Sequence, residues 1–161
     1  MNCCLEEALE KEWFISEIES YSGTMYRVAR SILNNDEDCR DALQDAALKA
    51  WEKRGSLRDP AHFRTWITRI LINSCYDTRR KNRRIVLTDL PEKPSDLPDP
   101  ELAVALSSLP EKLRLPLVLV FSEGMTYAEA AKALRIPVST LRGRIHRGRE
   151  QLRKELSENG K

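Results

Sequence analysis

Apolar residues recur every three or four positions along most of this chain, which is the spacing of amphipathic helices. Upstream of residue 88 the pattern predicts helices over residues 5–18, 25–33, 36–51 and 61–82, the third with Asp36 as its N-cap. The residues predicted to face the core of this part are Met25, Val28, Ala29, Ile32, Leu33, Cys39, Leu43, Ala46, Ala47, Ala50, Trp51, Phe63, Trp66, Ile67, Ile70 and Leu71.

One segment lacks this pattern. Residues 88–101 contain four prolines and five acidic residues, and proline disrupts helix interiors and central strands. We therefore expect two small helical domains, residues 10–87 and 102–157, joined by an acidic, proline-rich linker over 88–101. Because no strand pattern stands out, the predicted fold class is all-α.

The downstream part repeats the helical spacing in shorter segments. Helices are predicted over residues 102–109, 111–122, 126–134 and 138–156. The last two, joined by a short turn at 135–137, have the spacing of a helix–turn–helix with a small shared core. The predicted core residues of this motif are Ala130, Ala131, Leu134, Ile136, Val138, Leu141, Ile145 and Leu152.

Composition excludes several classes of protein. No apolar run is long enough to span a bilayer, and residues 1–13 are too acidic for a signal peptide, so a cytoplasmic location without membrane insertion is predicted. Cys3 and Cys4 are adjacent while Cys39 and Cys75 are isolated, so no Cys-x-x-Cys metal or redox spacing exists. We expect Cys39 and Cys75 to be buried thiols; a thiol sensor at Cys3 and Cys4 stays open as an alternative.

The net charge of +2 conceals two basic blocks. Residues 61–87 carry 7 basic and 1 acidic side chains, and residues 135–156 carry 7 and 2, whereas residues 88–101 carry 1 and 5. This segregation indicates two separate contacts with a polyanion, although either block alone would fit a solvated helix end.

The predicted helix–turn–helix carries the strongest functional signal. Thr126 and Glu129 have the spacing of a capping box at its start. The face of the last helix that its core leaves outside is basic and rich in hydrogen-bond donors, as a helix in a DNA major groove requires. The alternative is an arginine-rich solvated surface. The residues of that face are Ser139, Thr140, Arg142, Gly143, Arg144, His146, Arg147 and Arg149.

The helix over 61–82 combines aromatic residues with a basic end. Phe63 and Trp66 either belong to the core or stack on unpaired bases, and Asn73 and Asp77 lie on its more polar side. The residues expected to neutralise phosphates are Arg79, Arg80, Lys81, Arg83 and Arg84.

Three motifs resemble those of the extracytoplasmic-function (ECF) group of bacterial RNA polymerase sigma factors, in the order of that family, between residues 21 and 156. Residues 36–51 resemble its polymerase-binding helix, and Phe63-Arg-Thr-Trp66 with the residues that follow is similar to its promoter-melting helix. Residues 109–149 are similar to its domain that contacts the minus-thirty-five element. This sequence departs from the family's pattern at Ala46-Ala47, at Gly143 and in the loop over 55–62.

The resemblance implies a factor that carries core RNA polymerase to promoter DNA, under the control of an anti-sigma factor. It assigns polymerase binding to Asp38, Asp41, Gln44 and Asp45. It assigns the binding of a flipped base of the minus-ten element to the loop over 55–62 together with Asn73. It assigns the binding of the adjoining DNA backbone to the basic residues at the end of the helix over 61–82. It assigns minus-thirty-five bases to Arg142, Gly143, His146 and Arg147, and phosphates to Ser139, Thr140 and Arg144.

Two other classes of function fit the sequence less well. A free-standing helix–turn–helix repressor or activator would bind duplex DNA unaided and would not need the first domain. An enzyme finds little support, because His62 and His146 are far apart in the chain and no nucleophile, metal or phosphate-loop motif accompanies them. No cofactor and no small-molecule substrate are expected.

Overall fold

The computed structural model describes residues 2–82 and 99–160, and every regular element in these ranges is helical. The all-α prediction is therefore confirmed. Within the same ranges, no helix combines the length and the apolar composition that crossing a bilayer requires. The α-helices are α1 (Asn2–Ile32), α2 (Asp36–Glu52), α3 (Phe63–Asn82), α4 (Pro100–Ser108), α5 (Glu111–Leu117), α6 (Tyr127–Leu134) and α7 (Val138–Asn159).

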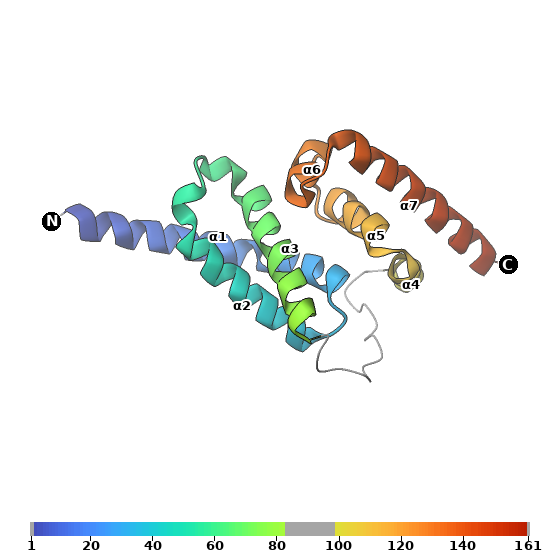
Figure 1. Cartoon of the computed structure of the whole chain (residues 1–161), viewed down its shortest axis with the longest axis horizontal. Coiled ribbons are helices and arrows are strands. Elements are labelled where there is room, and N and C mark those ends of the chain that lie inside the picture. The colour runs from blue at the N-terminus through green and yellow to red at the C-terminus, as the bar shows by residue number, and fades with distance from the viewer. Residues whose placement is uncertain (1, 83–98, 161) are drawn as a thin grey trace.

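The N-terminal domain consists of α1, α2 and α3, which contact one another pairwise (Figure 1). Helix α1 is continuous, whereas the sequence pattern predicted two helices at 5–18 and 25–33. The residues between contain no proline, and Tyr21 is buried there and hydrogen-bonded to Thr68 of α3 (3.0 Å). Tertiary packing thus outweighs the cost of about 1 kcal/mol that Gly23 imposes on a helix interior.

The start of α2 differs from the prediction by one residue. Asn35, not Asp36, is the N-cap: its backbone is extended and its side-chain oxygen accepts a hydrogen bond from the amide of Asp38 (2.8 Å). Asp36 is the first helical residue, and its carboxylate accepts a hydrogen bond from the hydroxyl of Tyr26. Two short 3-10 turns, η1 (Arg54–Ser56) and η2 (Pro60–His62), then lead into α3.

The C-terminal domain begins at Pro100, two residues before the predicted helix start, with Asp99 as the N-cap of α4. The helix predicted over 111–122 is α5 followed by a π-helical segment, η3 (Val118–Ser122). Pro116 lies inside α5 and cannot donate a backbone hydrogen bond to the preceding turn, so α5 is a short helix with one bond missing.

Helices α5 and α7 cross closely at Gly148. A Cβ atom at this position would lie 2.8 Å from Cδ1 of Leu117 and 3.3 Å from the carbonyl oxygen of Leu113. At Gly143, on the same helix, the nearest atom to such a Cβ would be a guanidinium nitrogen of Arg147 at 3.9 Å. Of these two glycines, Gly148 is the one whose missing side chain allows α5 and α7 to pack this closely.

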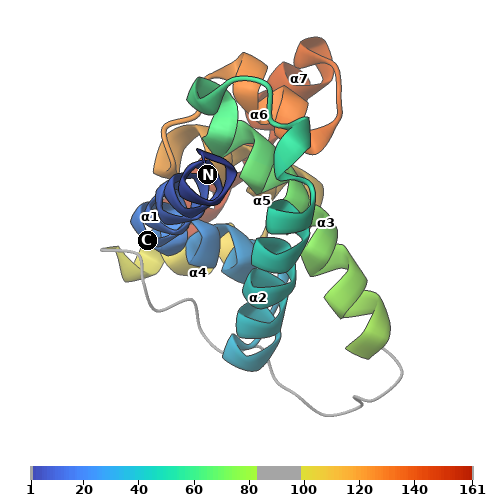
Figure 2. The same cartoon turned by 90° about the vertical axis from the view of Figure 1, so that its left-hand side faces the viewer.

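The two domains pack against each other. Helix α3 contacts α2 in its own domain and α6 in the other, and α1 contacts α5 (Figure 2). The buried apolar residues of both domains form one contiguous cluster, from Phe14 to Ile145. The segment 88–98 of the predicted linker lies outside the described residues.

We predict that the four cysteines differ sharply in reactivity. Cys3 and Cys4 are exposed, whereas Cys39 and Cys75 are buried, and burial raises the pKa of the Cys75 thiol to about 12. In a chromogenic disulfide assay at pH 8, two thiols are expected to react promptly and two only after unfolding, because the thiolate is the reactive form. Prompt reaction of all four in the folded protein would contradict the burial of Cys39 and Cys75.

Candidate nucleic-acid interface

Helices α6 and α7 form the predicted helix–turn–helix. The Thr126 amide donates to the Glu129 carboxylate (2.9 Å) and the Glu129 amide to the Thr126 hydroxyl (3.2 Å), which confirms the capping box. Arg135 ends α6 in the left-handed conformation (φ 55°), so the chain turns sharply into α7. Leu141 and Ile145 of α7 are buried, and α7 packs against both α5 and α6, which fixes the rotation of α7.

The outward face of α7 is basic, as predicted. Ser139, Arg142, His146 and Arg147 are exposed, and Thr140, Gly143 and Arg144 are half-buried. The core prediction for Val138 is wrong: this first helical residue is 36% exposed, because the turn of α7 that would cover it has not yet begun. His146 lies 3.6 Å from a carboxylate oxygen of Glu150, the nearest acid on the same helix.

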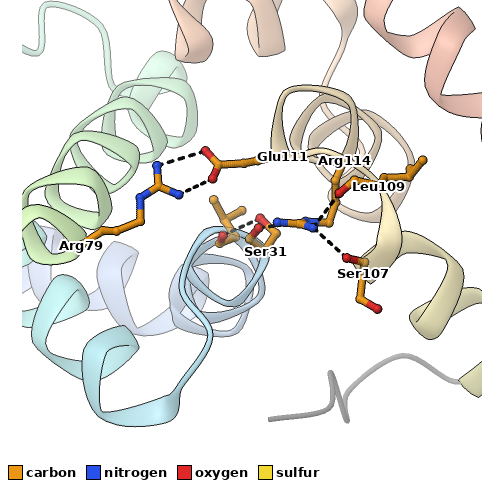
Figure 3. A network of polar contacts seen from close by, with 7 residues as sticks. Ser31, Arg79, Ser107, Leu109, Glu111 and Arg114 are labelled. Carbon is orange, nitrogen blue, oxygen red and sulfur yellow. Dashed lines mark hydrogen bonds and ion pairs between the residues drawn. The ribbon is translucent and has the colours of Figure 1, made fainter. Parts of the chain in front are cut away.

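The basic end of α3 is divided between free and engaged side chains. Asn73 and Lys81 are exposed, and Arg80 is exposed but paired with Asp77 of the preceding turn. Arg79 instead forms a bidentate ion pair with Glu111 of α5, in the other domain (Figure 3). The hydrogen bond to Glu111 raises the pKa of Arg79 further above its usual range. Arg83 and Arg84 lie outside the described residues.

A cavity of about 230 Å³ opens beside the 3-10 turns, next to the loop predicted to hold a base. Asn73 is not part of its wall; it lies two turns further along α3 than Trp66. Trp66 is half-buried and donates its indole N–H to the Ser56 hydroxyl (3.1 Å). The lining residues are Glu10, Trp13, Phe14, Arg54, Leu57, Pro60 and Trp66.

The structure separates the roles left open for Phe63 and Trp66. Phe63 is 1% exposed and makes edge contacts with Trp13 and Phe14, at centroid distances of 5.6 and 6.1 Å. Phe63 is therefore a core residue, and Trp66 is the aromatic side chain of this pair that a base can reach. The contributions of Glu10 and Trp13 to the cavity could not be predicted, because α1 is far from the loop in the chain. The contribution of Arg54, which directly precedes the predicted loop, was missed.

Part of the acidic face of α2 is solvent-exposed. Asp41 and Gln44 are exposed, whereas Asp45 pairs with Lys49 (2.7 Å) and Asp38 binds the side chains of Asn35 and Asn82. Lys49 also donates to Asp77 of α3 (3.1 Å), and this hydrogen bond lowers the pKa of Asp77.

An exposed apolar side chain accompanies this acidic face. Leu48 is 66% exposed, one turn after Gln44 and two turns after Asp41. An apolar residue within a polar helical stripe was the available sequence signal, and it was overlooked. Such a residue offers apolar contact area to a partner that binds the polar side chains around it.

Polar contacts between described residues join the two domains, and Figure 3 shows two of them. Besides Arg79 and Glu111, the guanidinium of Arg27 on α1 holds both carboxylate oxygens of Glu123 (2.7 and 3.0 Å). Nε of Arg114 donates to the carbonyl oxygen of Ser31, in the last turn of α1 (3.0 Å), and Nη1 donates to carbonyl oxygens of its own domain. A cation at the C-terminal end of a helix is electrostatically favoured.

No cluster of three or more His, Cys, Asp or Glu side chains suited to a metal ion occurs among residues 2–82 and 99–160. The charged side chains of the described surfaces gather in three places: a basic face on α7, a basic end on α3 and an acidic face on α2.

Comparison with known proteins gives the same division into two parts. The sequence model "Sigma-70 region 2" matches residues 18–85, and "Sigma-70, region 4" matches residues 100–152. The ECF RNA polymerase sigma factor SigE of Mycolicibacterium smegmatis is 32% identical over 87% of this chain, which spans 60% of that relative's length. The ECF RNA polymerase sigma factor SigM of Mycobacterium tuberculosis is 32% identical, with 82% of this chain and 71% of the relative covered.

A solved structure shares the fold. The sigma factor RpoE of Bartonella quintana, in complex with the anti-sigma factor NepR, superposes with a TM-score of 0.73 over 89% of this chain and 96% of RpoE. The two sequences are 23% identical.

Proposed function

Because the chain belongs to the ECF RNA polymerase sigma factors, we propose that it binds core RNA polymerase and directs initiation at specific promoters. In this role it performs no chemistry of its own, needs no cofactor and acts in the cytoplasm. The observation that carries the proposal is the presence of two basic helical surfaces, on α7 and at the end of α3, in one chain. A repressor that binds duplex DNA through its helix–turn–helix needs only the surface on α7.

The C-terminal domain, about residues 102–157, would contact the minus-thirty-five element. Arg142, His146 and Arg147 are exposed, so they can reach base edges in the major groove, where arginine binds guanine in bidentate fashion. Gly143 lies between them without a side chain, which lets the backbone of α7 approach the bases closely. The phosphate contacts are assigned to Ser139, Thr140 and Arg144.

The N-terminal domain, about residues 10–87, would bind the minus-ten element and the polymerase. Arg79, Arg80, Lys81, Arg83 and Arg84 would bind the DNA backbone, with Asn73 nearby on the same helix. The cavity beside the loop has an aromatic wall, with Trp13 and Trp66, which suits an unstacked base. Asn73 then contacts a neighbouring nucleotide rather than this base.

The polymerase surface would be the outward face of α2, formed by Asp38, Asp41, Gln44 and Asp45 with Leu48 among them. Asp41→Arg is expected to weaken binding to core polymerase about tenfold, since reversal replaces an attraction of about 0.2–1 kcal/mol with a repulsion of similar size. Titration of labelled full-length protein with core polymerase measures the change.

Glu19→Arg is the matched control for this variant, because Glu19 is an exposed acid on α1 of the same domain. It should bind as the wild type does. If both variants lost the same affinity for core polymerase, the effect would come from the change in net charge, and α2 would no longer be assigned as the polymerase surface.

The overall proposal is tested by transcription from a DNA pool with randomised upstream sequence. Reconstituted with core polymerase, the chain should enrich two spaced sequence elements among the transcribed templates, while the chain alone binds duplex DNA weakly. Tight binding of duplex operators by the isolated chain, with no complex on core polymerase, would favour a free-standing regulator.

An anti-sigma factor is proposed as a further partner, because the structural relative RpoE from Bartonella quintana forms a complex with the anti-sigma factor NepR. Affinity capture of the tagged chain from its host should then recover polymerase subunits and one additional protein that displaces them. Recovery of polymerase alone would leave the first part of the proposal and remove this one.

A further inference from the structure

The N-terminal part of α1, residues 3–13, extends beyond the other helices of its domain (Figure 1). Every residue in this range is exposed, and burial begins at Phe14, whose ring packs against Trp51 and Phe63. The range also precedes residue 18, where the match to sigma-70 region 2 begins. This part of α1 is therefore available to a partner.

The helix persists in this range for local reasons. Leucine, glutamate, alanine and lysine are strong helix formers, and Glu7 and Lys11 have the spacing and order of a stabilising ion pair along a helix. Because the segment continues a helix that the core already holds, it avoids the cost of nucleation. Its side chains are thus presented in a helical arrangement before any partner binds.

A stripe of large apolar side chains runs along this helix. Leu5, Leu9 and Trp13 are 68%, 60% and 37% exposed. Their spacing of four residues places them on one side of the helix over about 12 Å. Trp13 also contacts the ring of Phe63, so the stripe starts at the core of the domain. Single exposed apolar residues are common on protein surfaces, but an aligned row of three offers continuous contact area to a partner.

The charges beside the stripe indicate the chemistry of its partner. Glu6 and Glu12 lie three residues before and after Leu9, so they border the stripe on its two sides. Lys11 lies two residues after Leu9 and is therefore on the opposite side of the helix. An acidic border repels anionic lipid, nucleic acid and a second copy of the same stripe, whereas it attracts lysine and arginine side chains.

From these observations we propose that residues 3–13 of α1 are a docking site for a basic amphipathic helix of a partner protein. The apolar face of the partner helix packs on Leu5, Leu9 and Trp13, and its lysine or arginine side chains pair with Glu6 and Glu12. A stripe one side chain wide fits a single helix, as in a coiled-coil seam. The contact area is small, so the complex forms reversibly. The inference does not rest on the proposed function, because the polymerase surface is assigned to α2.

The test measures the binding of labelled helical peptides to the full-length protein by fluorescence anisotropy. One peptide carries a leucine stripe flanked by lysine, and the other is identical except that glutamate replaces lysine. The lysine peptide should bind, and Leu5→Ala with Leu9→Ala should weaken its binding about tenfold or more, because two leucine side chains lose their contact. Alanine is the strongest helix former, so this variant keeps α1 helical, which circular dichroism verifies.

Leu48→Ala is the matched control, because Leu48 is an exposed leucine among the acids of α2. It should leave binding of the lysine peptide unchanged and weaken binding of core polymerase, whereas Leu5→Ala with Leu9→Ala should do the reverse. Glu6→Gln with Glu12→Gln should weaken binding of the lysine peptide about two- to fivefold and reduce its dependence on salt.

The docking site would be overturned if the lysine peptide failed to bind, if the glutamate peptide bound equally well, or if Leu48→Ala caused the same loss. If the peptide results held but the wild-type protein did not bind core polymerase, the proposed function alone would be lost.

Other occupants of the stripe would respond differently to Leu5→Ala with Leu9→Ala. Light scattering of the protein alone would show a dimer that this variant dissociates if a second copy binds there. Flotation with phosphatidylglycerol vesicles would show binding that this variant loses if the stripe binds lipid. Either result would overturn the assignment to a basic helix.

The partner itself is identified in the host by cross-linking from a photo-reactive residue in place of Ala8, which is exposed and lies three residues after Leu5. Mass spectrometry of the cross-linked segment should show an apolar helical stripe flanked by lysine or arginine. A segment without this pattern, or no cross-link, would contradict the proposal.

Discussion

Replacing both Arg142 and Arg147 with alanine is expected to lower the affinity of the polymerase complex for its promoter by about 2–6 kcal/mol. Each arginine that makes a bidentate contact with a guanine contributes about 1–3 kcal/mol of discrimination, and losses at separate base pairs add. Neither side chain is buried, so the fold of the domain is preserved. Transcription from the selected promoter, measured against polymerase concentration, gives the loss directly.

The control for this variant is the pair Lys132→Ala and Lys154→Ala, which removes two exposed cations from the same domain. It should cost much less, and its effect should disappear as salt is raised, since such residues bind phosphate without regard to sequence. In the randomised pool, the arginine variant should also lose base preference at particular upstream positions. Equal effects of the two pairs would mean that α7 binds DNA through charge alone.

Local structure was predictable from the sequence where each residue's role depends on its neighbours in the chain. The capping box at Thr126 and Glu129 depends on two residues three apart, and it is present as predicted. The buried positions of α2 follow from the 3.6-residue period, although Ala42 belongs among them and was missed. Cys39 and Cys75 are buried as expected, because isolated apolar-like residues on a helical stripe pack inward.

The sequence could not reveal which charged residues are already paired. Arg79 and Glu111 are 32 positions apart, and Arg27 and Glu123 are 96 apart, on opposite sides of the linker. A run of basic residues at the end of a helix predicts affinity for polyanions, but its availability depends on the other domain. The packing of the domains therefore changes the interpretation of the basic block over 61–87 from one open surface to a partly masked one.

Close helix crossings were equally hidden. Ala130 and Ala131 were predicted as core residues of the helix–turn–helix and are indeed buried, whereas no packing role was predicted for Gly148. Gly148 lies at helical spacing from the predicted core residues Ile145 and Leu152, but this spacing does not reveal how closely the facing helix approaches. Its role becomes visible only when Leu117 of α5 is placed against it.

The second large effect is expected from Phe63→Ala, which should lower the free energy of unfolding by about 3–5 kcal/mol. Phe63 is the largest fully buried side chain, and its ring contacts Trp13, Phe14 and Trp66 from two different helices. Removing the ring leaves a cavity where α1 meets α3, and such a loss is a large share of the roughly 5–15 kcal/mol that stabilise a typical protein. Urea unfolding followed by circular dichroism measures it.

Trp66→Ala should affect DNA binding more than stability. This side chain is half-buried and lines the cavity, so its loss should cost less stability than that of Phe63. It should weaken binding of single-stranded minus-ten DNA in the polymerase complex by about 1–3 kcal/mol, the contribution of one base stacked on an aromatic ring. If Phe63→Ala instead left the urea midpoint unchanged and abolished single-strand binding, the base would stack on Phe63, and the division of roles between the two aromatic residues would be reversed.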